Sequence, residues 1–257
     1  MADSPYFQID EKRLSEKLGT ENVVFFDELP STNSFVLENP QLFSIGQTSL
    51  VVAQAQTAGR GQGENVWESR RGNLAFSVVS ILPLSPQDLL PHIAALPIAV
   101  GLQLRQTLVR ALSVSTSQVL VKWPNDLICK QRKIAGILIE TTPVSAGTMI
   151  CIGIGLNVNS SWLSESVTEE VQRHFAPSSL AELFNCQLNL TELLVACFQE
   201  LCPLVLTHHD GWKINREPTS FYGIGTSVRF ESTAGNIPGY STGSMKTVPS
   251  KSKPLVE

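Results

Sequence analysis

The chain has 257 residues, of which 42% are hydrophobic and 16% are charged, and its formal net charge is −4. This length and apolar content suit one large domain, or one domain with a small appendage, and the negative charge gives no reason to expect nucleic acid as a partner. The sequence holds no apolar run long enough to cross a membrane, and its first residues lack the basic and apolar regions of a secretory signal.

The cysteines indicate a reducing compartment. There are five, an odd number without a C-x-x-C pair, and the four histidines stand at no zinc-ligand spacing relative to them. Such usage is typical of buried free thiols, so we expect a cytoplasmic protein. Cys129 and Cys151 lie in apolar, strand-like runs, where a free cysteine usually packs as a small hydrophobic residue.

The first part of the chain predicts a short helix after Asp10, a strand at Val23–Phe26 and a second helix opened by Ser31-Thr32-Asn33. Ser31 or Thr32 can cap this second helix, and capping alone explains their presence. The alternative is that the triplet presents small polar groups to a ligand.

A glycine-rich loop follows the next predicted strand. Gly59, Gly61 and Gly63 alternate there with Arg60 and Gln62. Such a loop can bring backbone N–H groups and a guanidinium up to an anion. It is neither a P-loop, since no Gly-Lys-Ser/Thr follows, nor a dinucleotide fingerprint. Alone, it is equally typical of a flexible turn.

A strand and a helix are expected next. The run Asn73–Leu82 predicts a strand that ends at Pro83, and Ile98–Leu112 has apolar residues at helical spacing, with Pro97 in its first turn. Between loop and strand, Trp67 either covers a ligand or anchors the loop in the core, and core packing is the default expectation.

The rest of the chain is organised around a meander at Lys122–Glu140. It breaks at Pro124–Asp126, turns again at Lys130–Lys133 and leaves as a strand that contains Gly136. A glycine inside a strand often marks the close approach of a ligand or another backbone. A surface hairpin with ordinary turn residues explains this stretch equally well when it is taken alone.

A further strand is predicted at Met149–Asn159, with Gly153 and Gly155 on the same side. Their missing side chains would leave a slot in the sheet surface, although a bend at the glycines is an alternative. Ser179 then opens a helix with a capping box, and another helix runs to about Leu206.

Six motifs in this order, STN, QTAGRGQ, WESxxGNLxFS, KWPNDL, KIAGILIE and GIGLNVN, resemble biotin–protein ligases, also called holocarboxylase synthetases in eukaryotes. The resemblance is detailed from about Phe25 to Asn159 and looser up to Tyr222. It implies an α+β fold, a mixed sheet flanked by helices as in biotin and lipoate ligases and class II aminoacyl-tRNA synthetases. The catalytic domain would span 1–222, and 223–257 would hold a partial SH3-like segment, with room for three or four strands, and a disordered tail.

The resemblance also implies a two-step reaction. Biotin and ATP with Mg²⁺ give biotinyl-5′-AMP and pyrophosphate, and a lysine of the biotin carboxyl-carrier domain of a carboxylase then attacks the adenylate. Neither nucleic acid nor a membrane is expected as a partner, and the oligomeric state stays open. About two dozen residues precede the first core strand, so we expect a form without the DNA-binding domain of some relatives. The alternatives are a lipoate-type ligase of the same fold and a non-catalytic protein that binds biotin or its adenylate.

Site residues follow from the same resemblance. The implied biotin contacts are Ser31, Thr32, Asn33, Gln56, Gly59, Arg60, Gly61, Gln62, Lys133, Gly136, Gly153 and Gly155. The implied ATP contacts are Trp67, Lys122, Asn125, Asp126 and Asn157. Lys133 and Arg60 are the expected catalytic residues, because attack of a carboxylate on a phosphate needs fixed positive charge. Asp126 is expected to hold Mg²⁺ through ATP. Gln62 replaces a usual second arginine, so we expect weaker retention of the adenylate.

Overall fold

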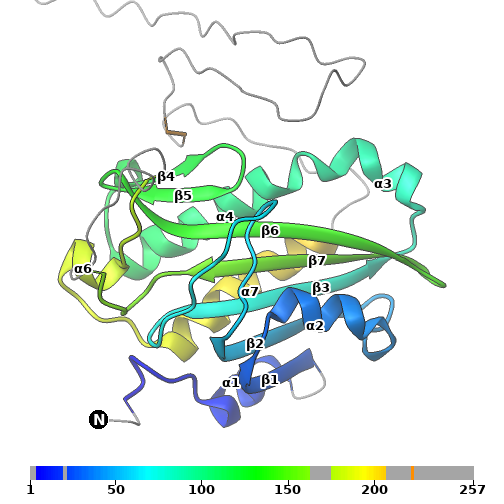
Figure 1. Cartoon of the computed structure of the whole chain (residues 1–257), viewed down its shortest axis with the longest axis horizontal. Coiled ribbons are helices and arrows are strands. Elements are labelled where there is room, and N and C mark those ends of the chain that lie inside the picture. Colours follow the sequence, from blue (N-terminus) through cyan, green and yellow to red (C-terminus); the bar gives the residue numbers. More distant parts are fainter. Residues whose placement is uncertain (1–3, 20–21, 163–174, 207–220, 223–257) are drawn as a thin grey trace, which may run out of the picture.

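The computed structural model describes residues 4–19, 22–162, 175–206 and 221–222. Within these residues seven strands form one sheet in the order β1-β2-β3-β7-β6-β5-β4 (Figure 1). The strands are β1 (Val23–Leu29), β2 (Thr48–Gln56), β3 (Leu74–Leu82), β4 (Val119–Lys122), β5 (Asp126–Cys129), β6 (Arg132–Val144) and β7 (Gly147–Leu156). Strands β1 and β2 are parallel and all other neighbours antiparallel, which confirms the predicted mixed sheet.

Helices flank this sheet on both faces. They are α1 (Glu11–Leu18), α2 (Thr32–Glu38), α3 (Pro86–Ile93), α4 (Leu96–Leu112), α6 (Leu180–Phe184) and α7 (Leu190–Leu206), with short 3-10 turns η2 (Pro40–Leu42) and η3 (Thr116–Gln118). None of the helices in the described ranges is both long and apolar enough to span a membrane. The predicted SH3-like segment and tail, 223–257, lie outside the described residues.

The two faces of the sheet are covered unequally. Helices α4 and α7 lie against one face, and α2 covers part of the other (Figure 1). Ile150 and Ile152 of β7 belong to the larger core under α4 and α7, whereas Cys151 between them belongs to a smaller core under α2. Next to α2, this second face carries Ser77 and glycines in place of large apolar side chains, so it stays open.

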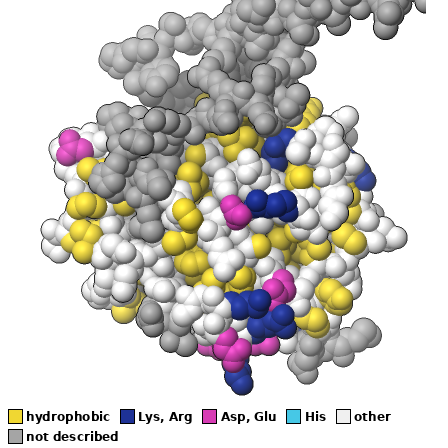
Figure 2. Space-filling model, turned by 180° about the vertical axis from the view of Figure 1, so that it is seen from behind, with side chains coloured by type: hydrophobic (Ala, Val, Ile, Leu, Met, Phe, Trp, Pro, Cys, Tyr) yellow, Lys and Arg dark blue, Asp and Glu magenta, His cyan; other side chains and the backbone are white. Residues whose placement is uncertain are grey.

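Figure 2 shows the molecule from the side opposite to that of Figure 1. On this face acidic and basic side chains of the described residues lie next to one another, among hydrophobic ones. Helices α4 and α7 are joined by an ion pair between Arg110 and Glu200, with 2.5 Å between Arg110 Nη2 and Glu200 Oε1.

Candidate active site

A cavity of about 590 Å³ opens on the sheet face that α2 leaves uncovered. Its floor consists of β7 and β6, where Gly155 lies beside Gly136 in register and Gly153 lies beside Leu138. The glycine-rich segment Gly59–Trp67, which we call the glycine loop, crosses in front of this floor (cyan in Figure 1).

The cavity brings together most residues that the sequence predicted for the site. Those on its wall are Ser31, Thr32, Asn33, Gln56, Arg60, Gly61, Gln62, Trp67, Lys122, Asn125, Asp126, Lys133, Gly136, Gly153 and Gly155. They come from the start of α2, the end of β2, the glycine loop, the β4–β5 turn and strands β6 and β7.

Gly59 and Asn157 are not among the described residues that line the cavity. A Cβ atom at Gly59 would lie 2.3 Å from the backbone oxygen of Trp67, so this glycine serves the close approach within the loop. The Asn157 side chain is buried and accepts a hydrogen bond from Asn73 Nδ2 at 3.0 Å. Both residues thus have structural roles here, and their expected ligand contacts stay predictions.

The glycines of β6 and β7 form the predicted slot, which side chains already occupy. A Cβ atom at Gly155 would lie 2.1 Å from Trp67 Cε2, and one at Gly153 would lie 2.2 Å from Asn33 Oδ1. Neither glycine has a positive φ, so glycine is needed at these positions because a side chain would not fit, and not because the backbone bends there. The default expectation that Trp67 packs in the core is wrong, because its half-buried indole forms a cavity wall.

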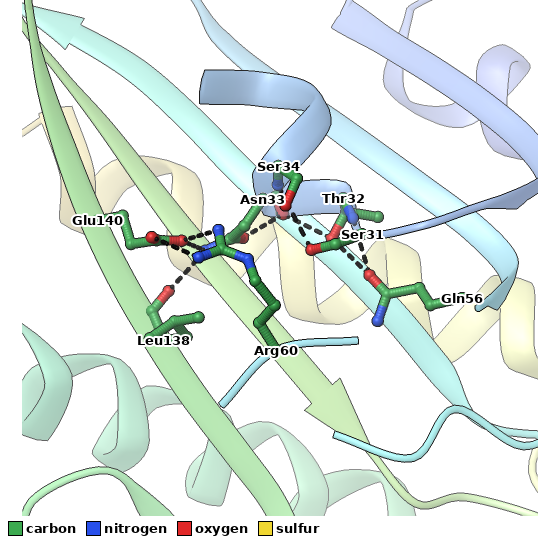
Figure 3. Close-up of polar contacts among 9 residues, drawn as sticks. Ser31, Thr32, Asn33, Ser34, Gln56, Arg60, Leu138 and Glu140 are labelled. Carbon is green, nitrogen blue, oxygen red and sulfur yellow. Dashed lines mark hydrogen bonds and ion pairs between the residues drawn. The ribbon is translucent and has the colours of Figure 1, made fainter. Parts of the chain in front are cut away.

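One end of the cavity is polar and nearly neutral (Figure 3). Ser31 caps α2 by accepting from Ser34 N, as predicted, while the two residues after it serve the cavity. Thr32 N donates to Gln56 Oε1 at 2.8 Å. Ser77 Oγ lies 2.8 Å from Thr32 Oγ1 and 2.6 Å from Asn33 Oδ1. These contacts join α2, β2 and β3 into one hydrogen-bonded group.

Arg60 lies at the same end, and its guanidinium group is already hydrogen-bonded. Its Nη1 and Nη2 atoms donate to the two carboxylate oxygens of Glu140, at 3.0 and 2.6 Å (Figure 3). Asn33 Nδ2 donates to Glu140 Oε2 at 2.8 Å. In the protein without ligands Glu140 thus offsets the charge of Arg60, and the catalytic role expected of Arg60 stays a prediction. The sequence analysis missed Glu140. A carboxylate at the end of the otherwise apolar strand of the KIAGILIE motif could have indicated it.

The other end of the cavity is basic. Asp126 is buried between two lysines, with its Oδ1 2.7 Å from Lys133 Nζ and its Oδ2 3.3 Å from Lys122 Nζ. Lys122 Nζ also lies over the Phe175 ring, and Lys133 Nζ over the Trp67 indole, each 5.6 Å from the ring centroid. Two ammonium groups and one carboxylate leave this end with a net positive charge suited to an anion.

The residues fit a magnesium ion only in part. Asp126 is the carboxylate found among the described lining residues, and both of its oxygens face lysines. No group of three potential metal ligands occurs among the described histidines, cysteines and acidic residues. Mg²⁺ prefers six oxygen ligands, so here it would depend mainly on phosphate oxygens and water, with Asp126 as a single protein ligand.

A segment far along the chain completes the basic end. Phe175 and Pro177 line the cavity, and neither was predicted. Lys133 N donates to Ala176 O at 3.0 Å, and Ser178 N donates to Lys133 O at 3.1 Å. The segment thus pairs with the backbone of Lys133 and fixes its position.

Comparisons with known proteins agree with this arrangement. The model of the Biotin/lipoate A/B protein ligase family matches residues 25–157. The bifunctional ligase/repressor BirA of Salmonella typhimurium is 30% identical over 168 residues, which are 65% of this chain and 50% of that protein. Biotin–protein ligase 2 of Arabidopsis thaliana is 30% identical over 172 residues, 67% of this chain and 49% of that protein. The chain thus spans about half the length of these relatives.

Solved structures show the same fold. The biotin protein ligase of Leishmania major in complex with biotinyl-5-AMP has 26% sequence identity and a TM-score of 0.61, over 84% of this chain and 87% of that one. The Aquifex aeolicus biotin protein ligase in complex with biotin and ATP is 24% identical with a TM-score of 0.64, over 83% and 84% of the two chains.

Proposed function

Because this chain belongs to the biotin/lipoate A/B protein ligase family, we propose that it activates biotin with ATP as biotinyl-5′-AMP and transfers the biotinyl group to a lysine of a biotin carboxyl-carrier domain. The observation that carries the proposal is the division of the cavity into a neutral polar end and a basic end. Biotin has the same division, with an uncharged cyclic urea at one end and a carboxylate at the other.

The polar end favours biotin over lipoate. Thr32, Asn33 and Gln56 offer hydroxyl and amide groups that can donate to and accept from a urea. The dithiolane ring of lipoate has neither the N–H donors nor the carbonyl acceptor of a urea, and a site built for hydrogen bonds discriminates strongly against a ligand that lacks them.

At the basic end the first step joins two anions. An oxygen of the biotin carboxylate attacks the α-phosphorus of ATP, the new P–O bond forms, and the bond to pyrophosphate breaks. Lys133 and Lys122 offset the charge that gathers there, and Trp67 offers an aromatic face to the adenine. Mg²⁺ bound with ATP, with Asp126 as its protein ligand, would neutralise phosphate charge.

In the second step the amine of the carrier lysine attacks the carbonyl carbon of the mixed anhydride and AMP leaves. Water would destroy the same anhydride, so the glycine loop above the cavity has the task of excluding it. We place the reaction in the cytoplasm, since all five cysteines are free thiols.

A transfer assay tests the proposal. Purified protein, ATP-Mg and labelled biotin are incubated with a carrier domain of a carboxylase, beside the same carrier with its target lysine replaced by arginine. Label on the lysine-bearing carrier alone is the expected result. Formation of biotinyl-AMP without label on the carrier would mean that the protein catalyses only the first step. Bound biotin without adenylate would favour a non-catalytic binder. Efficient transfer of lipoate in place of biotin would contradict the substrate.

A further inference from the structure

The glycine loop is a small hairpin that holds its own shape. Arg60 and Val66 form a β-bridge, Trp67 N donates to Gly59 O at 2.9 Å, and Gly61 N donates to Asn65 O at 2.7 Å. Residues 62–66 at its tip are exposed. These contacts fix the loop internally, so its position over the cavity depends on side chains that reach across to the sheet.

Arg60 makes such a connection from the loop to the sheet. Its fork meets both oxygens of Glu140 on β6, and two parallel N–H···O bonds fix the angle of the loop as well as its distance. The exposed fractions of the Arg60 and Glu140 side chains are 41% and 23%, so water screens the pair in part. The free energy of the contact is therefore modest, and it can yield during opening.

Glu140 is also held by a hydrogen bond that does not involve the loop. Asn33 of α2 donates from Nδ2 to Glu140 Oε2 at 2.8 Å, and Ser77 Oγ lies 2.6 Å from the Asn33 side-chain oxygen. The carboxylate thus connects the loop with the polar end of the cavity, where the head of the ligand would bind (Figure 3). Nearby on the same sheet face, Cys151 and Val79 are apolar, so packing alone does not call for a carboxylate at position 140.

We propose that Glu140 is a positioning residue that latches the glycine loop over the cavity through Arg60. The effects of this latch on ligands rest on the proposed function, whereas the latch itself can be tested in the protein without ligands. A ligand at the polar end that rearranges Asn33 would also act on the latch, which couples filling of the head subsite to closure of the loop. Without the latch, biotin binds more weakly and biotinyl-AMP escapes into solution.

Proteolysis of the protein without ligands tests the latch. Glu64 stands in the exposed tip of the loop, where a glutamate-specific protease should cut faster when the loop moves freely away from the sheet. We expect Glu140→Gln to speed this cut about twofold to fivefold, the upper part of the range for a partly exposed ion pair. The matched control is Glu28→Gln, the same change at an exposed position on β1, which should leave the rate unchanged. Equal rates for Glu140→Gln and wild type would overturn the proposal.

A double-mutant cycle separates the latch from a general loss of stability. Arg60→Gln and Glu140→Gln should each speed the cut at Glu64, and the double variant should add little, because either change alone breaks the pair. Additive effects would contradict the assignment. The unfolding temperature of each variant should stay near that of the wild type. A large fall in the unfolding temperature of Glu140→Gln would also contradict the assignment, because Glu140 would then stabilise the fold as a whole.

The ligase assay then measures how loss of the latch affects substrate binding and release of the adenylate. Glu140→Gln should raise KM for biotin more than KM for ATP and increase the share of biotinyl-AMP found free in solution. If the protein proves not to be a ligase, the cleavage results still decide on the latch. If it is a ligase and cleavage does not change, the latch alone fails.

Discussion

Asp126 sets the charge of the basic end of the cavity. It is only 8% exposed, and its two oxygens face different lysines. Without this carboxylate, Lys122 and Lys133 would place two like charges in a half-buried space, where they would repel each other. Asp126 offsets this repulsion and holds both ammonium groups in one place, which preorganises them for an anionic transition state.

Removing one ammonium group from this cluster should stop adenylate formation with little effect on folding. We expect Lys133→Ala to lower the rate of biotinyl-AMP synthesis at least 100-fold, because one charge at the transition state contributes about 3–4 kcal/mol. Pyrophosphate release with biotin and ATP measures this rate. Lys12→Ala is the control, since that lysine is 87% exposed on α1. A near-normal rate in Lys133→Ala would rule out its role.

At the scale of the elements, helix α6 contains a carboxylate, Glu182, that accepts hydrogen bonds from several segments. Glu182 forms the predicted capping box with Ser179, and it also accepts from Ser178 Oγ at 2.8 Å, Ser161 Oγ at 3.3 Å and Trp162 N at 2.5 Å. Burial alone would raise the pKa of the Glu182 carboxyl, but these hydrogen bonds together hold it below the ordinary value. The helix start thereby anchors the segment that pairs with Lys133.

This depressed pKa makes the stability of the α6 region pH-dependent. The ionised carboxylate stabilises the fold above the ordinary pKa of a glutamate, about 4.3, and this contribution is lost as the pH falls through the lower folded pKa. The difference in unfolding free energy between wild type and Glu182→Gln should thus be constant from pH 7 to about 5 and shrink below about 4. Urea titrations measure it, with exposed Glu38→Gln as a control whose difference stays flat. A difference that grows in acid would contradict this role.

Elements with a local signal were predictable from the sequence, and those that depend on unusual turns were not. The α4 helix starts at Leu96 with Pro97 in its first turn, close to the prediction. The sequence analysis predicted no helix between Pro83 and α4, yet Pro86 opens α3, because Ser85 Oγ accepts from Asp88 N and proline suits a first helical turn.

The turn between β5 and β6 shows why strand boundaries shifted. Lys130 and Gln131 have φ values of 46° and 58°, a two-residue hairpin turn that usually takes asparagine or glycine. Since neither residue signals such a turn, a longer one was expected and β6 starts earlier than predicted, at Arg132.

Site residues divide in the same way. The glycine floor followed from strand alternation, and the lysines followed from motifs whose residues are close in sequence. Glu140 escaped notice because its partner Asn33 is 107 residues away, and only the fold places the two together. Phe175 reaches the cavity through pairing of its segment with Lys133, which no local pattern indicates.

At the scale of the whole molecule, contacts between distant segments tie the layers together. The Asp10 backbone N–H donates to Thr191 Oγ1 at 2.9 Å, across 181 residues. Arg13 and Lys17 of α1 both pair with Glu192 of α7, at 2.6 and 3.1 Å. The larger core includes side chains from α1, α4, α6, α7 and all the strands but β1, whose Val23 and Phe25 pack against it. The layers should therefore unfold together.

Buried cysteines can report whether they do. Burial raises the pKa of Cys129 on β5 to about 11, and those of Cys151 on β7 and Cys197 on α7 to about 12. Since the thiolate is the reactive form, these three should resist alkylation at pH 8 while the partly exposed Cys186 and Cys202 react.

Labelling at increasing urea concentration, followed by peptide mass spectrometry, then tests cooperativity. Cys151 belongs to the core under α2, and Cys129 and Cys197 belong to the core on the other face. If the molecule unfolds as one unit, all three should become reactive at the same urea midpoint, and that midpoint should match the loss of helical circular dichroism. Exposure of Cys151 at lower urea than the other two would mean that the α2 side, with the polar end of the cavity, opens on its own. Ligand binding could then depend on that opening instead of on the glycine loop.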